Sequence, residues 1–317
     1  MQIFKNPNYD FVRWRWQALA LSAVVILAGV FLIATRGLQK GVDFEGGTIV
    51  ILKFNETPDL NRITEALGGD AVVQQYGEAE NRDVMIRVKR VGEESGADLS
   101  REVDRIISTL KAGNAGAFND TPVGTDVVGP VVGEQLRRQG IWATVLAMAG
   151  ILAYIALRFQ FSFAVGAVAA TLHDLLVCLA VLAFFRYDMT LNVVAGLLTI
   201  TGYSVNDTIV IFDRVRENMR GMRRDNLTTI VNTAVNQPLS RTVITAGTTL
   251  LSVIALYLFG GEVLEGFAFT MLVGIISGTY STVFIASAIA IILQGRKPLK
   301  GQPAAAATPR AGKRRAS

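Results

Sequence analysis

The sequence contains very little cysteine, histidine and charge. Its 317 residues include one cysteine, Cys178, and one histidine, His173. A disulfide framework, a cysteine-rich metal site and a histidine-cluster metal site are therefore excluded. Charged side chains make up 18 % of the residues, whereas an average soluble domain has about 25 %. This deficit argues against a cytosolic enzyme. It argues equally against a disordered chain, which needs low hydrophobicity and high net charge.

Apolar residues, in contrast, make up 51 % of the chain. A helix needs about 20 of them to cross the hydrocarbon core of a bilayer. Six runs are candidates, and we assign spans to residues 16–35, 141–157, 163–185, 191–212, 242–259 and 267–293. The first run is too long for a signal-peptide h-region and is expected to remain as an anchor. The last is long enough to tilt or bend.

The basic residues are concentrated between some of these runs and not others. Residues 213–241 contain six basic and three acidic side chains, and residues 294–317 contain seven basic and no acidic ones. Residues 36–140 carry 13 basic and 17 acidic side chains. The positive-inside rule therefore places residues 1–15, 213–241 and both termini in the cytoplasm. The net charge of +5 thus reflects membrane topology, and no nucleic-acid partner is expected.

Residues 36–140 have the pattern of a small folded domain outside the cytoplasm. Four β-rich segments and two helical segments follow one another in the order β-α-β-β-α-β, which is typical of a ferredoxin-like α+β unit. The segments are 48–54, 58–67, 71–76, 84–88, 99–110 and 126–132. This domain has no nucleophile–base pair and no metal-ligand spacing, so it is expected to bind or position something. The fold class predicted for the whole chain is a multi-pass α-helical membrane protein with this one domain.

The sequence Gly-Val-Asp-Phe-Glu-Gly-Gly-Thr lies where the first span meets this domain. Gly41, Asp43, Gly46 and Gly47 are candidate hinge or junction residues, since glycine allows positive φ and close backbone approach. A simple structural turn is the alternative.

Asp207 is the most informative residue of the membrane runs. A carboxylate near the centre of a transmembrane helix costs about 2.5–3.5 kcal/mol to insert, so it is a candidate for reversible protonation. Arg241, after a predicted N-cap at Ser240, is its candidate partner. Two structural alternatives remain open: Arg214 neutralises Asp207, and Arg241 only sets the topology.

Other polar residues accompany Asp207 inside the membrane. His173 and Asp174 are adjacent in the third run and point about 100° apart on a helix. Asn206 and Thr208 flank Asp207. All four are candidates either for a proton path or for hydrogen-bonded anchors between helices. Residues 226–237 are predicted to form an amphipathic interfacial helix. Residues 294–317 are expected to be a disordered basic tail that can touch anionic membrane lipids.

Four of these segments carry a resemblance to a known family: Gly41–Thr48, Leu172–Asp174, Gly202–Asn218 and Ser240–Thr242. With them the chain resembles the SecF branch of the SecD/SecF family of protein-export membrane subunits, within the RND-like superfamily. The resemblance implies pairing with SecD, whose six spans would complete a twelve-helix unit. It also implies that Asp207 and Arg241 take part in proton passage, and that the external domain guides the emerging preprotein.

The expected function is therefore that of an auxiliary, non-enzymatic subunit of the Sec channel complex in the plasma membrane. With SecD it would use the proton-motive force to promote late-stage preprotein translocation. No cofactor or metal is expected. The sequence has no P-loop motif, so nucleotide energy must come from another subunit. Two alternatives remain: half of a proton-driven exporter of small molecules or lipids, and a non-transporting scaffold of the Sec channel.

Overall fold

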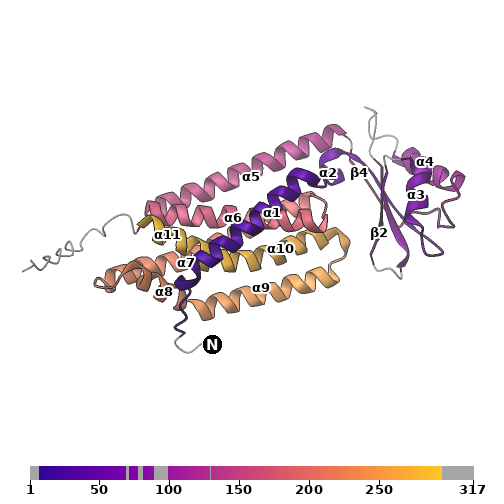
Figure 1. Ribbon diagram of the computed structural model, residues 1–317. Coiled ribbons are helices and arrows are strands. Elements are labelled where there is room, and N and C mark those ends of the chain that lie inside the picture. The colour runs from indigo at the N-terminus through magenta and orange to yellow at the C-terminus, as the bar shows by residue number, and fades with distance from the viewer. Residues whose placement is uncertain (1–6, 69–70, 78–80, 89–98, 129, 295–317) are drawn as a thin grey trace, which may run out of the picture.

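The computed structural model describes residues 7–68, 71–77, 81–88, 99–128 and 130–294. Long helices form a bundle, and a small sheet domain lies at one end of it (Figure 1). The bundle consists of η1 (Val12–Trp14), α1 (Arg15–Arg36), α5 (Pro130–Arg158), α6 (Phe161–Phe185), α7 (Leu191–Gly221), α8 (Leu227–Asn236), α9 (Leu239–Phe259), α10 (Glu262–Ser281), η4 (Thr282–Ala286) and α11 (Ser287–Gln294). Within the described residues, six helical segments are long and apolar enough to cross a membrane, which confirms the predicted number of spans.

The centre of the bundle is formed by α6, α7 and α10, and small residues allow these helices to approach closely. A Cβ atom at Gly274 of α10 would lie 2.4 Å from the Ile200 side chain of α7. On the other side, a Cβ atom at Gly29 of α1 would lie 2.1 Å from Cβ of Ala180 on α6. Such contacts are how transmembrane helices gain packing energy where no hydrophobic effect drives them together.

Several helices differ from the predicted spans at their ends. Helix α5 begins at Pro130, well before residue 141, and α7 continues beyond the apolar run to Gly221. The last span is interrupted by the π-helical turn η4, between α10 and α11. Helix α9 begins at Leu239 with Pro238 in the N-cap position, so the predicted N-cap at Ser240 is wrong.

The sheet domain has the predicted order of elements. It contains α2 (Val42–Glu45), β1 (Gly47–Lys53), α3 (Leu60–Leu67), β2 (Ala71–Tyr76), β3 (Asp83–Val88), α4 (Leu99–Ala112) and β4 (Gly124–Val128). The strands form one antiparallel sheet in the order β2-β3-β1-β4, as in ferredoxin-like folds, and the fold class is confirmed. The last strand ends at Val128, before the predicted end at residue 132, because Pro130 begins α5.

The core of this domain lies between the sheet and its two helices. Val50, Leu52, Val84 and Ile86 alternate along β1 and β3 and are fully buried, as period-two patterning requires. Ile63, on α3, is buried in the same cluster. The β-branched strands and amphipathic helices therefore form an independent core at one end of the membrane bundle.

Candidate functional site

Asp207 lies on α7 with only 7 % of its surface exposed. Its Oδ2 atom is buried and has no hydrogen-bond partner within the part of the chain that the structure describes. An ionised carboxylate normally fills its acceptor positions when it is buried. An oxygen left without a donor is therefore a costly arrangement for the charged form.

Arg241 is exposed in the first turn of α9. It lies near enough to act on the Asp207 carboxylate electrostatically, but no ion pair between them is present among the described residues. Arg214 is bonded to Glu217 at 2.5 Å on the surface of α7. The structure therefore brings Asp207 and Arg241 into one region without the expected direct contact, and it gives Arg214 a different partner.

The residues on either side of Asp207 face opposite environments. Thr208 is buried, and its hydroxyl lies 2.9 Å from that of Thr282 in η4, so it anchors α7 to the π-helical turn. Asn206 is exposed on the outer side of α7. Three hydroxyl residues of α9 are exposed as well: Thr245, Thr248 and Ser252. We call Asn206 and these three residues the polar stripe.

A second buried carboxylate, Asp174, lies on α6 with 1 % of its surface exposed. It accepts hydrogen bonds from Ser204 of α7 at 2.5 Å, and from Ser277 and Ser281 of α10 at 2.7 Å each. Nδ1 of His173 lies 3.1 Å from its Oδ1 atom. Four groups thus surround one carboxylate, two at each oxygen.

His173 extends this network to α1. Its Nε2 atom lies 2.9 Å from Oγ of Ser22, which in turn lies 3.3 Å from the hydroxyl of Tyr280. The Tyr280 hydroxyl donates to the carbonyl oxygen of Ala18 at 2.8 Å. The structure therefore joins the two predicted residues into one buried network across α1, α6, α7 and α10.

Sequence reasoning missed the hydroxyl members of this network. Ser22, Ser277 and Ser281 lie inside apolar runs, where serine is common at helix contacts. The one signal available was the spacing of Ser277 and Ser281, since residues four apart share a face of a helix. That spacing does not reveal that the shared face meets Asp174.

The glycine-rich segment lies between α1 and the sheet domain. Gly46 and Gly47 have φ of 72° and 146°, which other residues rarely adopt. The Gly41 N–H group donates to the Met189 carbonyl at 2.7 Å. Asp43 Oδ2 accepts from the backbone N–H of Leu191, the first residue of α7, at 2.8 Å. The junction therefore caps the helix that carries Asp207.

Two further contacts fix the sheet domain at this end. Arg87 of β3 makes a two-pronged ion pair with Asp188, which lies between α6 and α7. Next to Asp188, Tyr187 donates to Glu265 at 2.6 Å and contacts Tyr257 at 3.2 Å. Burial, followed by these hydrogen bonds, raises the pKa of Tyr187 far above the ordinary tyrosine value, so the phenol stays neutral and donates.

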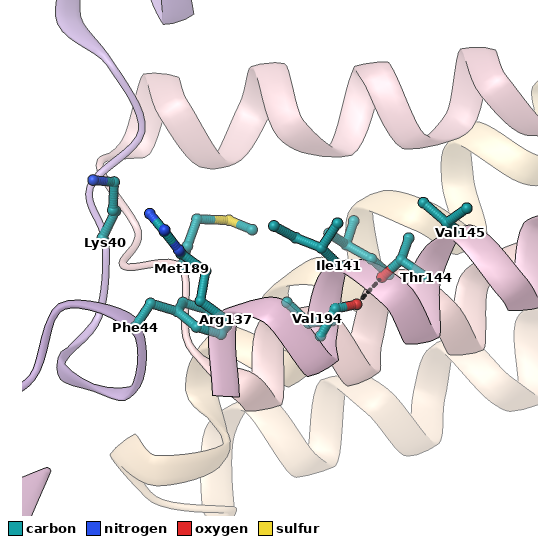
Figure 2. A pocket seen from close by; sticks show the side chains of 10 residues that line it. Lys40, Phe44, Arg137, Ile141, Thr144, Val145, Met189 and Val194 are labelled. Atoms are coloured by element: carbon teal, nitrogen blue, oxygen red, sulfur yellow. Dashed lines mark hydrogen bonds between the residues drawn. The ribbon is translucent and has the colours of Figure 1, made fainter. Parts of the chain in front are cut away.

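A pocket of about 330 Å³ lies beside the junction, between α2, α5 and the start of α7. Figure 2 shows Phe44, Arg137 and Met189 near one end of the pocket and Val145 near the other. Most of its wall is apolar, and Lys40 and Arg137 contribute the charged side chains. Among the described residues, no group of three or more metal-ligating side chains is present anywhere in the fold.

Comparison with protein-family models gives two matches. Residues 110–296 match the model described as "Protein export membrane protein SecD/SecF, C-terminal", and residues 31–58 match the "SecD/SecF GG Motif". The chain belongs to the SecD/SecF family. The second match contains Gly41, Asp43, Gly46 and Gly47, so the junction is a recognised motif of this family.

Relatives and solved structures agree with this assignment. The chain is 41 % identical to the protein translocase subunit SecF of Vibrio alginolyticus, over 92 % of each chain. It is 40 % identical to the SecF of Rhodothermus marinus, over 93 % of this chain and 96 % of the relative. The crystal structure of SecDF from Thermus thermophilus, a translocon-associated membrane protein, superposes with a TM-score of 0.80 at 30 % identity. That match covers 92 % of this chain and 39 % of the SecDF chain.

Proposed function

We propose that this SecF-family chain is an accessory, non-enzymatic subunit of the Sec export machinery in the plasma membrane. With a SecD partner it couples inward proton flow to the late stage of preprotein translocation. Asp207 is the carboxylate that gains and loses the proton, and Arg241 is the cation that stabilises its ionised form. His173, Asp174, Asn206 and Thr208 are the polar residues around this path.

The observation that carries the proposal is the Oδ2 atom of Asp207, buried without a donor among the described residues. A bundle arrangement of this kind favours the neutral carboxyl. An arrangement that brings Arg241 into contact favours the ionised form. Alternation between the two would let a proton bias a two-state bundle. One charge moving through about 100 mV supplies about 2.3 kcal/mol, which corresponds to a bias of about 50-fold.

The polar stripe supports the SecD partnership. The three hydroxyls of the stripe donate to carbonyl oxygens of their own helix, so the costly group in hydrocarbon is the Asn206 amide. Helices usually turn such a group toward another helix or a water-filled path. Within this chain Asn206, Thr248 and Ser252 are exposed. The relative from Thermus thermophilus carries SecD and SecF in its name. A second six-helix unit packed on α7 and α9 would cover the stripe and enclose Asp207.

The junction supports the transmission of this change to the external domain. Asp43 caps α7, and Arg87 holds the sheet to the loop that precedes α7. A shift of α7 would therefore move the sheet domain. Movement of that domain on the outer side would hinder backward sliding of an emerging preprotein.

The cytoplasmic location of both termini is part of the proposal. Backbone N–H groups of Tyr9 and Phe11 bond to Asn236 and Asn232 of α8, so residues 9–11 lie beside the 213–241 segment. Figure 1 shows α8 at the end of the bundle opposite the sheet. The basic residues of that segment match the positive-inside rule. Reporter fusions after Asn236 and within α4 are expected to give cytoplasmic and external signals, respectively.

The decisive experiment is export into inverted membrane vesicles that contain Asp207→Asn together with the SecD partner. The expected result is loss of the stimulation that the proton-motive force gives, with ATP-driven export retained. Asp213→Asn is the matched control, because it removes a carboxylate of the same helix that pairs with Arg158 at the surface. Full stimulation with Asp207→Asn would favour the scaffold function. Proton-driven export of small molecules by the wild-type chain without any effect on preproteins would favour the exporter.

A further inference from the structure

The network around His173 contains more hydrogen-bond contacts than its hydroxyl groups can supply with hydrogens. Three contacts lie in series: His173 Nε2 to Ser22 at 2.9 Å, Ser22 to Tyr280 at 3.3 Å, and Tyr280 to the Ala18 carbonyl at 2.8 Å. Each contact needs one hydrogen. Serine and tyrosine hydroxyls supply one hydrogen each, so two of the three contacts are satisfied by Ser22 and Tyr280. The third hydrogen must come from Nε2.

The second ring nitrogen of His173, Nδ1, limits the protonation state of the imidazole further. Nδ1 lies 3.1 Å from Asp174 Oδ1, and two acceptors would repel each other at that distance. One hydrogen therefore lies between Nδ1 and Asp174. With a hydrogen on Nε2 as well, His173 and Asp174 together hold two protons and are neutral as a pair. Because Asp174 also accepts from Ser204, Ser277 and Ser281, the favoured form is an imidazolium beside a carboxylate.

We propose that the His173–Asp174 pair is a second proton-binding site of the bundle, and that its protonated form holds α1 against α6 and α10. Release of the proton leaves a net negative charge on the pair. This charge is buried, because only 1 % of the Asp174 surface is exposed. It also leaves one of the three contacts to α1 without a hydrogen. Protonation and the seating of α1 are thereby coupled.

In the part of the chain that the structure describes, His173 is the one counter-ion that contacts Asp174. Helix α1 contributes Ser22 and has no ionisable side chain between Trp16 and Thr35. Helix α10 contributes Tyr280. The centres of the Tyr280 and His173 rings lie 6.0 Å apart, a distance at which a cation–π contact can form. On α7, Ser204 is followed by Asp207 one turn later, and on α6 itself Cys178 follows. Among the described residues no lysine or arginine pairs with Asp174.

The functional consequence concerns the connection between the membrane and the sheet domain. Helix α1 leads through Gly37 and Lys40 into the junction segment at Gly41. A site that loosens α1 on deprotonation therefore acts on the junction from a second side, independently of Asp207 and α7. The inference goes beyond the function proposed above and does not require that Asp207 titrates.

The presence of a single histidine makes the test direct. The full chain is labelled with ¹⁵N-histidine, purified with a tag that contains no histidine, and reconstituted in lipid. The ¹⁵N signals of one imidazole then report which ring nitrogens carry hydrogen. At neutral pH we expect Nε2 to carry a hydrogen. When the pH is raised until that hydrogen is lost, the amides of residues 18–22 are expected to lose protection from hydrogen exchange in the same titration.

Two variants test the hydrogen count itself. Tyr280→Phe removes two of the three contacts and one hydroxyl hydrogen, so the hydrogen of the Ser22 hydroxyl can serve Nε2. We expect the midpoint to fall by roughly half a unit to one unit, the value of one hydrogen bond. Ser22→Ala removes the acceptor of Nε2–H, and a larger fall is expected since bonds to charged groups are stronger. Tyr154→Phe, an exposed tyrosine of α5, is the matched control and should leave the midpoint unchanged.

Three results would overturn the proposal. The first is an Nε2 atom without hydrogen at neutral pH. The second is an imidazolium that never releases its proton while the protein remains folded, which would make the pair a fixed structural bridge. The third is a normal titration that leaves hydrogen exchange in α1 unchanged. Because Tyr280→Phe and Ser22→Ala each remove a single group, the result does not depend on a variant that loses Asp174.

Discussion

Asp174 and Asp207 are buried in the same bundle, on neighbouring helices, and they differ in what surrounds them. Asp174 has a contact at each of its four acceptor positions, supplied by three helices. Asp207 has an oxygen with no partner in the described chain, and Arg241, the cation that acts on it electrostatically, lies on an exposed turn. A fully surrounded carboxylate fixes the helices around it, whereas an incompletely surrounded one is free to change its charge.

The largest expected difference is in stability. Asp174→Ala leaves three hydroxyls and His173 without their acceptor, and it should lower the free energy of unfolding by about 3–5 kcal/mol. Asp207→Ala removes a poorly satisfied group and should cost less than about 1 kcal/mol. Equilibrium unfolding in mixed detergent micelles measures both. Equal losses of stability would show that hydrogen bonding does not distinguish Asp174 from Asp207.

A smaller substitution sharpens the same comparison. Ser204→Ala removes the shortest bond to Asp174, at 2.5 Å, and should cost about 1.5–3 kcal/mol because the acceptor is charged. Ser287→Ala is the control: it removes a buried hydroxyl of the same size, which bonds only to a backbone carbonyl at 3.2 Å. Its expected cost is about 0.5–1.5 kcal/mol. A loss at Ser204 no greater than at Ser287 would contradict an ionised Asp174.

The fold could be predicted from local patterns of the sequence, because each pattern agrees with how the helices and strands pack in the structure. Six apolar runs are enough to find the spans, and period-two alternation in 84–88 is enough to find a central strand. The helix ends were less predictable. Helix α7 continues past Phe212 through charged residues to Gly221, and hydropathy cannot follow a helix beyond its apolar run.

The candidate site was predictable only in part. Asp207, Asp174 and His173 stand out because ionisable residues are expensive inside a membrane. Their partners do not stand out, since serine within an apolar run is ordinary. The absence of direct contact between Asp207 and Arg241 depends on how α9 is placed against α7, a tertiary property that no spacing in the sequence encodes.

A third carboxylate, Glu265, lies in the first turn of α10 and accepts a hydrogen bond from the Tyr187 hydroxyl at 2.6 Å. Tyr187→Phe should cost about 1 kcal/mol at neutral pH. Because burial raises the pKa of Tyr187 in the folded chain, this contribution is complete below the unfolded value of about 10. It declines above that pH, as the unfolded chain begins to ionise. Thermal unfolding of both proteins at alkaline pH should show a steeper loss for the wild type, and parallel curves would argue against a buried phenol.

The smallest expected effect on stability is that of Arg241→Met. Arg241 is exposed in this chain and makes no ion pair with Asp207, so the free energy of unfolding should change by less than about 0.5 kcal/mol. Stimulation of export by the proton-motive force should nevertheless be lost, because the ionised form of Asp207 loses its cation. Normal stimulation would leave Arg241 with a role in topology alone.

Infrared difference spectroscopy of the reconstituted complex, recorded as a proton gradient is imposed and collapsed, tests the central claim most directly. The account predicts a protonated-carboxyl band that appears and disappears with the gradient, is absent in Asp207→Asn, and persists in Asp213→Asn. If Asp207 remains ionised throughout, with the same spectrum in wild type and Asp207→Asn, proton coupling through this residue is contradicted.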